Sequence, residues 1–171
     1  MSLAALRTVL GIASALLLGA LFWLSERSLT PAGFDTFDGS PLGYDKAYAI
    51  AYLSALNDEA RAIYTGPVRI LDSLFPPVFT GFLVLMLLRS IETWPRPLRV
   101  PAMLFPVAYL VFDLLENRAV AHMLSLPIKD LGEDLVARAS LFTQAKYLSF
   151  MISGLAILLF GILFRRGKGA V

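Results

Sequence analysis

The sequence has no cysteine and a single histidine, and both shortages narrow the chemistry open to the protein. Without cysteine, disulfide bonds, thiolate catalysis and cysteine-ligated metals are excluded. Imidazole is the usual nitrogen ligand of transition metals, so one histidine argues against a metal site built from protein ligands alone. We therefore predict neither a metal ion nor a cofactor.

Charged residues are also scarce. Only 16% of the 171 residues are charged and 57% are hydrophobic, whereas a soluble domain has about 25% charged residues. The composition predicts an integral membrane protein, and the length suits one domain covering residues 1–171. The net charge is +2 and no basic tract is longer than the one at residues 165–168, so nucleic acid is not an expected partner.

Four hydrophobic runs are long enough to cross a bilayer, which takes roughly 20 residues per helix. They cover about residues 4–24, 72–91, 100–123 and 141–164. The first run resembles the apolar part of a signal peptide, but it lacks a small-x-small cleavage site before Glu26, and we expect a retained anchor. The sequence thus predicts an all-α bundle of four transmembrane helices.

Lysine and arginine predict the orientation of these helices. Basic residues dominate both chain ends and the short loop between the second and third runs, namely Arg7, Arg89, Arg96, Arg99, Arg165, Arg166 and Lys168. The loops on the other side are longer and contain more acids than bases. Because short cytoplasmic loops are enriched in Lys and Arg, we expect the N- and C-termini in the cytoplasm.

The long loop between the first two runs has two halves. Its first half, "TPAGFDTFDGSPLG", has the composition of irregular turns. Its second half, about residues 44–65, places Tyr44, Tyr48 and Tyr52 four residues apart, and Gly66-Pro67 follows as a stop signal. We predict an amphipathic helix on the outer, extracytoplasmic face, acting either as a simple cover or as a lid.

The third hydrophobic run carries ionisable residues inside the membrane. By three- and four-residue spacing, one helix face holds Tyr109, Asp113, Glu116 and Asn117. Arg118 and His122 fall on the opposite stripe, where we expect them at the surface. Charges inside a membrane are costly and commonly mark functional sites, so the first face is a candidate site, with Asp113 and Glu116 as candidate catalytic residues.

Residues from other runs reach the same depth. At ~1.5 Å per residue, Gln144 and Lys146 of the fourth run and Asp72 of the second lie near the level of Glu116. Buried acids need a counter-charge, so we predict that Lys146 pairs with Asp113 or Glu116. Neutral hydrogen bonds from Asn117 and Gln144 are expected to bridge the cluster. Asp72 and Arg61 are expected to form a second pair at its rim.

Several short motifs appear in a familiar order. "AYLSALNDEARAIY", "LDSLFPPVF" and "FDLLEN", followed by a lysine early in the last run, resemble a group of uncharacterised small bacterial four-helix integral membrane proteins over roughly residues 44–150. The loop motif of that group is closer to Leu-Gly-x-x-Gly-Arg-x-x-Tyr. Here Arg61 and Tyr64 match, while Asn57 and Ala60 replace the glycines. The resemblance implies a bacterial inner (plasma) membrane location and a shared polar cluster, and it implies no activity.

A weaker likeness concerns architecture only. The emopamil-binding and sigma-2-receptor family also contains small proteins of four or five helices with acids facing a lipid-sized cavity. Its members bind sterol-like amines or shift a double bond. No motif aligns with that family, so the likeness assigns no role to any residue here.

Three classes of function remain open. The protein binds a lipid or small apolar molecule beside the cluster; or it is an enzyme that modifies a lipid, with Asp113 or Glu116 as general acid–base; or it is an accessory subunit whose polar cluster only holds helices together. The expected partners are a membrane lipid and a membrane protein or second copy of the chain. Gly11, Ala15 and Gly19 form a seam suited to close helix contact, which we expect inside the bundle, with a dimer seam as the alternative. A cavity beside Glu116 favours the first two classes, and tight packing there favours the third.

Overall fold

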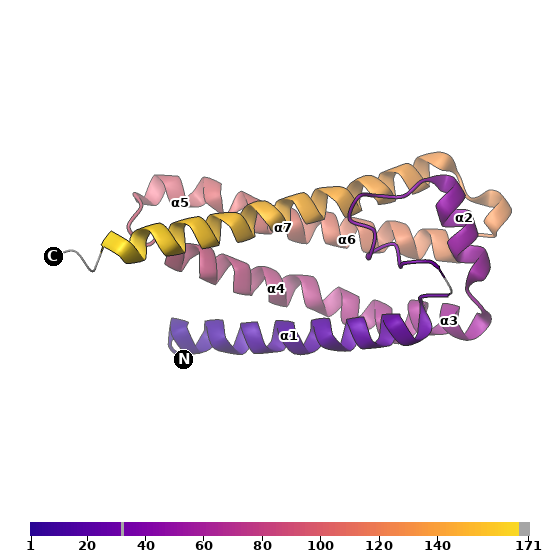
Figure 1. The fold of residues 1–171 in the computed structure, drawn as a ribbon, viewed down its shortest axis with the longest axis horizontal. Coiled ribbons are helices and arrows are strands. Elements are labelled where there is room, and N and C mark those ends of the chain that lie inside the picture. Colours follow the sequence, from indigo (N-terminus) through magenta and orange to yellow (C-terminus); the bar gives the residue numbers. More distant parts are fainter. Residues whose placement is uncertain (32, 168–171) are drawn as a thin grey trace.

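The computed structural model describes residues 1–31 and 33–167, with side chains described as far as Gly161. Throughout this part of the chain the regular structure is helical and no strand is present (Figure 1). Four helical stretches are long and apolar enough to cross a membrane: Leu3–Ser28, Asp58–Ser90, Arg96–Ser125 and Glu133–Gly161. The predicted all-α class with four spanning helices is confirmed.

The elements follow one another as helices joined by short turns, apart from one long loop after the first helix. They are α1 (Leu3–Ser28), α2 (Lys46–Ala55), α3 (Asp58–Ile63), the π-helix η1 (Tyr64–Val68), α4 (Arg69–Ser90), α5 (Arg96–Ala102), α6 (Leu104–Ser125), the 3₁₀-helix η2 (Ile128–Asp130) and α7 (Glu133–Gly167).

The helix predicted over about residues 44–65 is interrupted. The chain is extended at Leu56, and the side chain of Asn57 accepts a hydrogen bond from the backbone N–H of Ala60, which caps a new helix, α3. The expectation that Gly66-Pro67 ends this helix is wrong. The π turn of η1 carries the chain past Pro67 into α4, so the second spanning helix begins at Asp58.

Helix α4 is central to the bundle. It packs against α1, α6 and α7, and α6 packs closely along α7, whereas α1 packs chiefly on α4. A Cβ atom at Gly11 of α1 would lie 3.0 Å from the ring of Phe82 on α4, so this glycine allows close approach inside the bundle. A Cβ atom at Gly19 would meet nothing within 4 Å, so only one of the two glycines of the small-residue seam lies against a neighbouring helix.

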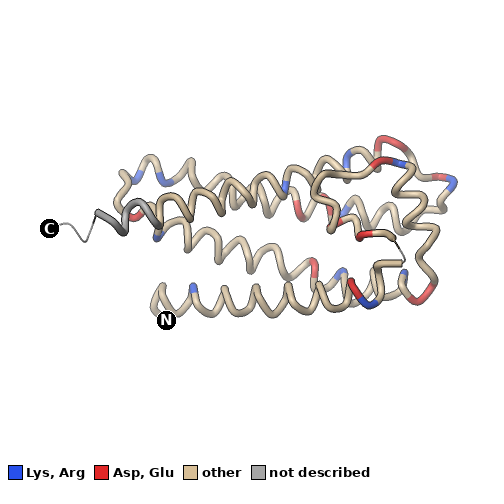
Figure 2. The backbone as a smooth tube through the Cα atoms, viewed as in Figure 1, with Lys and Arg blue, Asp and Glu red and all other residues tan. Residues whose placement is uncertain are grey.

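The two ends of the bundle differ. The first turn of α1 and the last described turns of α7 lie at the same end, while α2 crosses the opposite end (Figure 1). Charged residues gather mainly at the α2 end, and the middle of the helices is largely free of them (Figure 2). This distribution fits four crossings of a bilayer.

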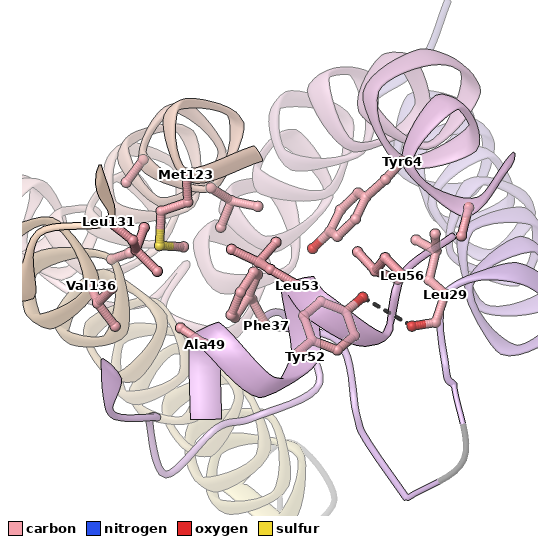
Figure 3. Close-up of a cluster of buried hydrophobic side chains, with 14 of the residues drawn as sticks. Leu29, Phe37, Ala49, Tyr52, Leu53, Leu56, Tyr64, Met123, Leu131 and Val136 are labelled. Carbon is pink, nitrogen blue, oxygen red and sulfur yellow. Dashed lines mark hydrogen bonds between the residues drawn. The ribbon is translucent and has the colours of Figure 1, made fainter. Parts of the chain in front are cut away.

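The loop from α1 to α2, which we call the strap (residues 29–45, described except for residue 32), is held by aromatic packing. Phe37 and Tyr52 are fully buried, with ring centroids 4.9 Å apart, in the cluster drawn in Figure 3. The Tyr52 hydroxyl donates to the carbonyl oxygen of Leu29 at 2.9 Å, and burial raises the pKa of that phenol. Tyr48 binds both the N–H and the carbonyl of Asp35. These contacts give an irregular loop one defined course.

Gly43 generates a stability prediction. It has a φ of +87°, and an added Cβ would meet the side chain of Gln144 and lie 2.6 Å from Ser140 Oγ. Gly33 has a similar φ of +89° with nothing within 4 Å. Gly33→Ala should cost only the left-handed conformation, about 1–2 kcal/mol, and Gly43→Ala should cost about 1–3 kcal/mol more through overpacking.

Unfolding of both variants in detergent, titrated with sodium dodecyl sulfate, measures this difference. Equal destabilisation by the two substitutions would show that the strap does not contact α7 at Gly43.

Candidate functional site

Lys146 lies at the centre of a buried ion cluster. Its side chain is 5% exposed, and its ammonium nitrogen contacts carboxylate oxygens of Asp38, Glu116 and Asp113, the last at 3.2 Å. Glu116 and Asp113 are themselves buried. The predicted ion pair of Lys146 with Asp113 or Glu116 is confirmed, and the lysine pairs with both.

Hydrogen bonds join the cluster across three helices. Thr143, one turn before Lys146 on α7, donates its hydroxyl to Glu116 Oε1 of α6 at 2.5 Å. The amide of Asn117 donates to Asp113 Oδ2 at 3.3 Å and to the backbone carbonyl of Asp72 on α4 at 3.1 Å. The bridging role predicted for Asn117 is therefore found, and α4, α6 and α7 are fixed to one another at this level.

Asp38 is a member of the cluster that sequence reasoning missed. It comes from the strap, its side chain is 54% exposed, and its backbone carbonyl accepts a hydrogen bond from the Tyr147 hydroxyl at 2.9 Å. The strap contains several acids without periodicity, so no pattern distinguishes Asp38. Thr143 did leave a signal, because it precedes Lys146 by three residues and so shares its helix face, and Tyr147 follows Thr143 by four residues.

Asp72 has an unusual position in the cluster. It is partly buried and lines the cavity described below, yet no described residue forms a hydrogen bond or ion pair with its carboxylate. The predicted pair with Arg61 is wrong. Arg61 instead donates to the carbonyl oxygen of Leu53 at 2.5 Å, because the last turn of α2 leaves its carbonyl groups without helical partners.

Gln144 also departs from its predicted place. It is exposed and donates weakly to Ser140 Oγ at 3.5 Å, beside Gly43 of the strap. Two residues along a helix correspond to about 200° of rotation, so Gln144 points away from the side on which Lys146 lies. Arg118 and His122 are exposed on α6, as predicted for the stripe opposite Asp113.

A cavity of about 710 Å³ lies beside the cluster, a size within the usual range for small-molecule sites. Residues from α1, the strap, η1, α4, α6 and α7 form its walls. Among them are Glu26, Asp35, Asp38, Arg69, Asp72, Asp113, Glu116, Asn117, Lys146 and Tyr147, together with Leu18, Leu21, Phe22, Tyr64, Val68, Phe75, Phe79, Tyr109, Val120 and Phe150. Arg61 and Gln144 are not among the cavity residues.

The cavity has an aromatic part and a polar part. Phe79 lies with its ring centroid 5.5 Å from that of Tyr109 and 5.6 Å from that of Phe150, so α4, α6 and α7 each contribute one ring. Asp113 follows Tyr109 by one helical turn, and Lys146 precedes Phe150 by one turn. The charged cluster therefore adjoins the aromatic part directly, and one molecule can touch both.

Tyr44, the first tyrosine of the predicted loop helix, lies beside the cluster. Its hydroxyl oxygen is buried near Thr143 and Glu116. Burial raises the pKa of this phenol, and the negative charge of Glu116 raises it further. Tyr44 is therefore neutral, and it is not among the residues that line the cavity.

The carboxylates suggest a cation site, but the protein supplies the cation. Oxygen atoms of Asp38, Asp113 and Glu116 lie within 4.8 Å of one another, a spacing that a metal ion can bridge. The ammonium group of Lys146 contacts all three and takes the place that such an ion would need. We therefore treat the arrangement as an internal ion cluster.

No family model, curated protein or solved structure matches this chain.

Removing the central cation should expose how much the bundle depends on it. Lys146→Met leaves Glu116 and Asp113 buried without their counter-charge, and loss of one partner of a buried pair typically costs about 3–5 kcal/mol. A second change, Glu116→Gln, removes one buried negative charge while keeping the shape, and should recover much of that loss.

Asp38→Asn is the matched control for the second change. Asp38 contacts the same ammonium but is half exposed, so its neutralisation should recover little when combined with Lys146→Met. Unfolding in detergent ranks the three variants. A Lys146→Met protein as stable as the parent would mean that the lysine does not neutralise buried acids.

Proposed function

We propose that this protein binds an amphipathic, lipid-like molecule in the cavity between α1, α4, α6 and α7. The apolar part of the ligand lies against the aromatic rings of Phe79, Tyr109 and Phe150, and its polar part meets the ion cluster. The observation that supports this proposal best is that the aromatic rings and the charged cluster adjoin each other in one cavity. A purely polar or purely apolar ligand would leave one of them unmatched.

The alternative of a purely structural cluster has less support. Polar groups that only join helices are expected to be satisfied by one another in a tightly packed interface. Here the carboxylate of Asp72 borders the cavity without a hydrogen bond or ion pair from the described residues. Buried ion pairs are also seldom the most stable filling of a core, so a costly cluster beside a cavity suits binding better than an accessory subunit's packing.

A lipid-modifying enzyme is the second candidate, favoured by the unequal surroundings of two carboxylates. Both carboxylates contact Lys146, but Glu116 also accepts the Thr143 hydroxyl at 2.5 Å, whereas Asp113 accepts the amide of Asn117 at 3.3 Å. Two acids in different environments beside a bound molecule suit general acid–base transfer, with Asp113 facing the ligand. To test this activity, the Asp113→Asn variant replaces the parent protein in the host. Support for the activity would be a variant that still binds lipid, in a host whose lipid composition changes in the same way as when the protein is deleted.

We further propose that the protein resides in a bacterial inner membrane with both termini in the cytoplasm. Arg89 near the end of α4 and Arg96 and Arg99 in α5, which flank the short turn between these helices, support this orientation by the positive-inside rule. The α2 end is then outside, and the ion cluster lies in the outer half of the bilayer.

Reporter fusions test the orientation. A reporter after residue 171 should be active in the cytoplasm, and one inserted near residue 42, in the strap, should be active outside, because one crossing separates the strap from the N-terminus and three separate it from the C-terminus. A cytoplasmic signal from the strap would reverse the orientation.

Filling the cavity tests the binding proposal. Leu18 and Leu16 are both exposed leucines of α1, at 53% and 70%, but only Leu18 lines the cavity. Leu18→Trp should reduce the lipid retained by the purified protein, as read by native mass spectrometry, because the larger ring occupies ligand volume. Leu16→Trp is the control and should retain lipid like the parent. Equal retention by all three proteins, or no retained lipid in the parent, would contradict the proposal.

A further inference from the structure

The end of the cavity near α2 is covered by the strap. Phe37 of the strap is fully buried, and Asp38 binds Lys146 of α7 while its carbonyl binds Tyr147. The strap therefore runs from the end of α1 to the middle of α7 and spans the space between these helices (Figure 1). A ligand arriving from the water on that side meets a segment fixed at both ends.

The side of the cavity between α1 and α7 is different. Among the described residues, helix α1 packs chiefly on α4 and makes no extensive contact with α7. Yet both helices contribute apolar side chains that line the cavity and are also exposed at the surface: Leu18 (53%) and Phe22 (66%) on α1, and Phe150 (37%) on α7. These three apolar side chains form a mouth of the cavity between α1 and α7.

This mouth lies among the apolar turns of two candidate spanning helices. In a bilayer, its surroundings are acyl chains and not water, so an apolar rim carries no desolvation cost there. The other side of the cavity, between η1–α4 and α6, is narrowed by polar contact, because Arg69 donates to the backbone carbonyl of Asn117 at 3.4 Å.

We infer that the space between α1 and α7, beneath the strap, is a lateral portal through which the acyl chain of a bilayer lipid enters the cavity. The inference rests on the proposed binding function and narrows it: the ligand is a membrane lipid from the leaflet at the α2 end. Its chain passes Phe22 and Phe150 to reach Tyr109, and its polar group stays with the ion cluster. Because α1 is held mainly by α4, its outer half is the wall that can yield as the chain passes.

Cysteine labelling tests the portal, since the chain has no native cysteine. Phe22→Cys is compared with Trp23→Cys, a neighbouring residue of similar exposure (59%) that does not line the cavity. Each variant is labelled with a bulky maleimide and reconstituted into vesicles containing a phospholipid with a diazirine in its acyl chain. After illumination, mass spectrometry measures lipid attached to Tyr109, which is only 6% exposed and lines the cavity wall.

The unlabelled variants and labelled Trp23→Cys should show lipid on Tyr109, and labelling Phe22→Cys should abolish it. On α1, Leu18→Cys and Leu16→Cys form a second matched pair, since Leu18 lines the cavity and is 53% exposed, whereas Leu16 is 70% exposed and lies outside the cavity wall. This pair provides the same comparison if Phe22→Cys does not fold, and the same loss on labelling is expected only for Leu18→Cys.

The outcomes separate the portal from the binding function. Lipid on Tyr109 that persists after both Phe22→Cys and Leu18→Cys are labelled would overturn the portal and leave lipid binding in place. Attachment to Tyr109 only from a short-chain diazirine amphiphile supplied in the water would overturn the membrane route and keep the cavity as a binding site. If neither probe reaches Tyr109, both the inference and the proposed function fail.

Discussion

The structure depends on one ammonium group placed among carboxylates inside an apolar bundle. Charges taken out of water lose solvation worth several kcal/mol each, and only close opposite charges and hydrogen bonds compensate for this loss. Lys146 provides that compensation for Glu116 and Asp113 at once, and Thr143 and Asn117 satisfy further carboxylate oxygens. Because these residues come from α6 and α7 and bind the backbone of α4, the electrostatic requirement also sets how three helices meet.

The same requirement explains the strap. Asp38 brings an acid from an irregular loop down to Lys146, and this contact pins the loop across α7. The aromatic cluster around Phe37 and Tyr52 fixes the rest of the loop, so its course is determined by burial and not by hydrogen-bonded secondary structure (Figure 3). Helix α1, in contrast, contributes no charge to the ion cluster and packs mainly on α4, which leaves room for the cavity on its other side.

Much of this could be predicted from the sequence, for identifiable reasons. Long apolar runs determine the spanning helices, and helical spacing places Asp113, Glu116 and Asn117 on one face. The need to neutralise buried acids identified Lys146. Asp38 could not be found in this way, because a contact across 108 positions from a loop leaves no periodic trace. The prediction for Gln144 is wrong because residues at the same depth can point to different sides of a helix, and Gln144 contacts Ser140 instead. The prediction for Arg61 is wrong because the carbonyl oxygen of Leu53, at the end of α2, accepts its hydrogen bond in place of Asp72.

An experimental density map of the protein purified in its native membrane lipids would test the central claim most directly. We expect one continuous elongated density that runs from the ion cluster at Lys146, past Tyr109 and Phe79, to the space between Phe22 and Phe150. Rings of Phe79, Phe150 and the α1 side chains packed together with no density between them, and Lys146 still paired with its acids, would contradict it. In that case the ion cluster would serve only to hold the helices together.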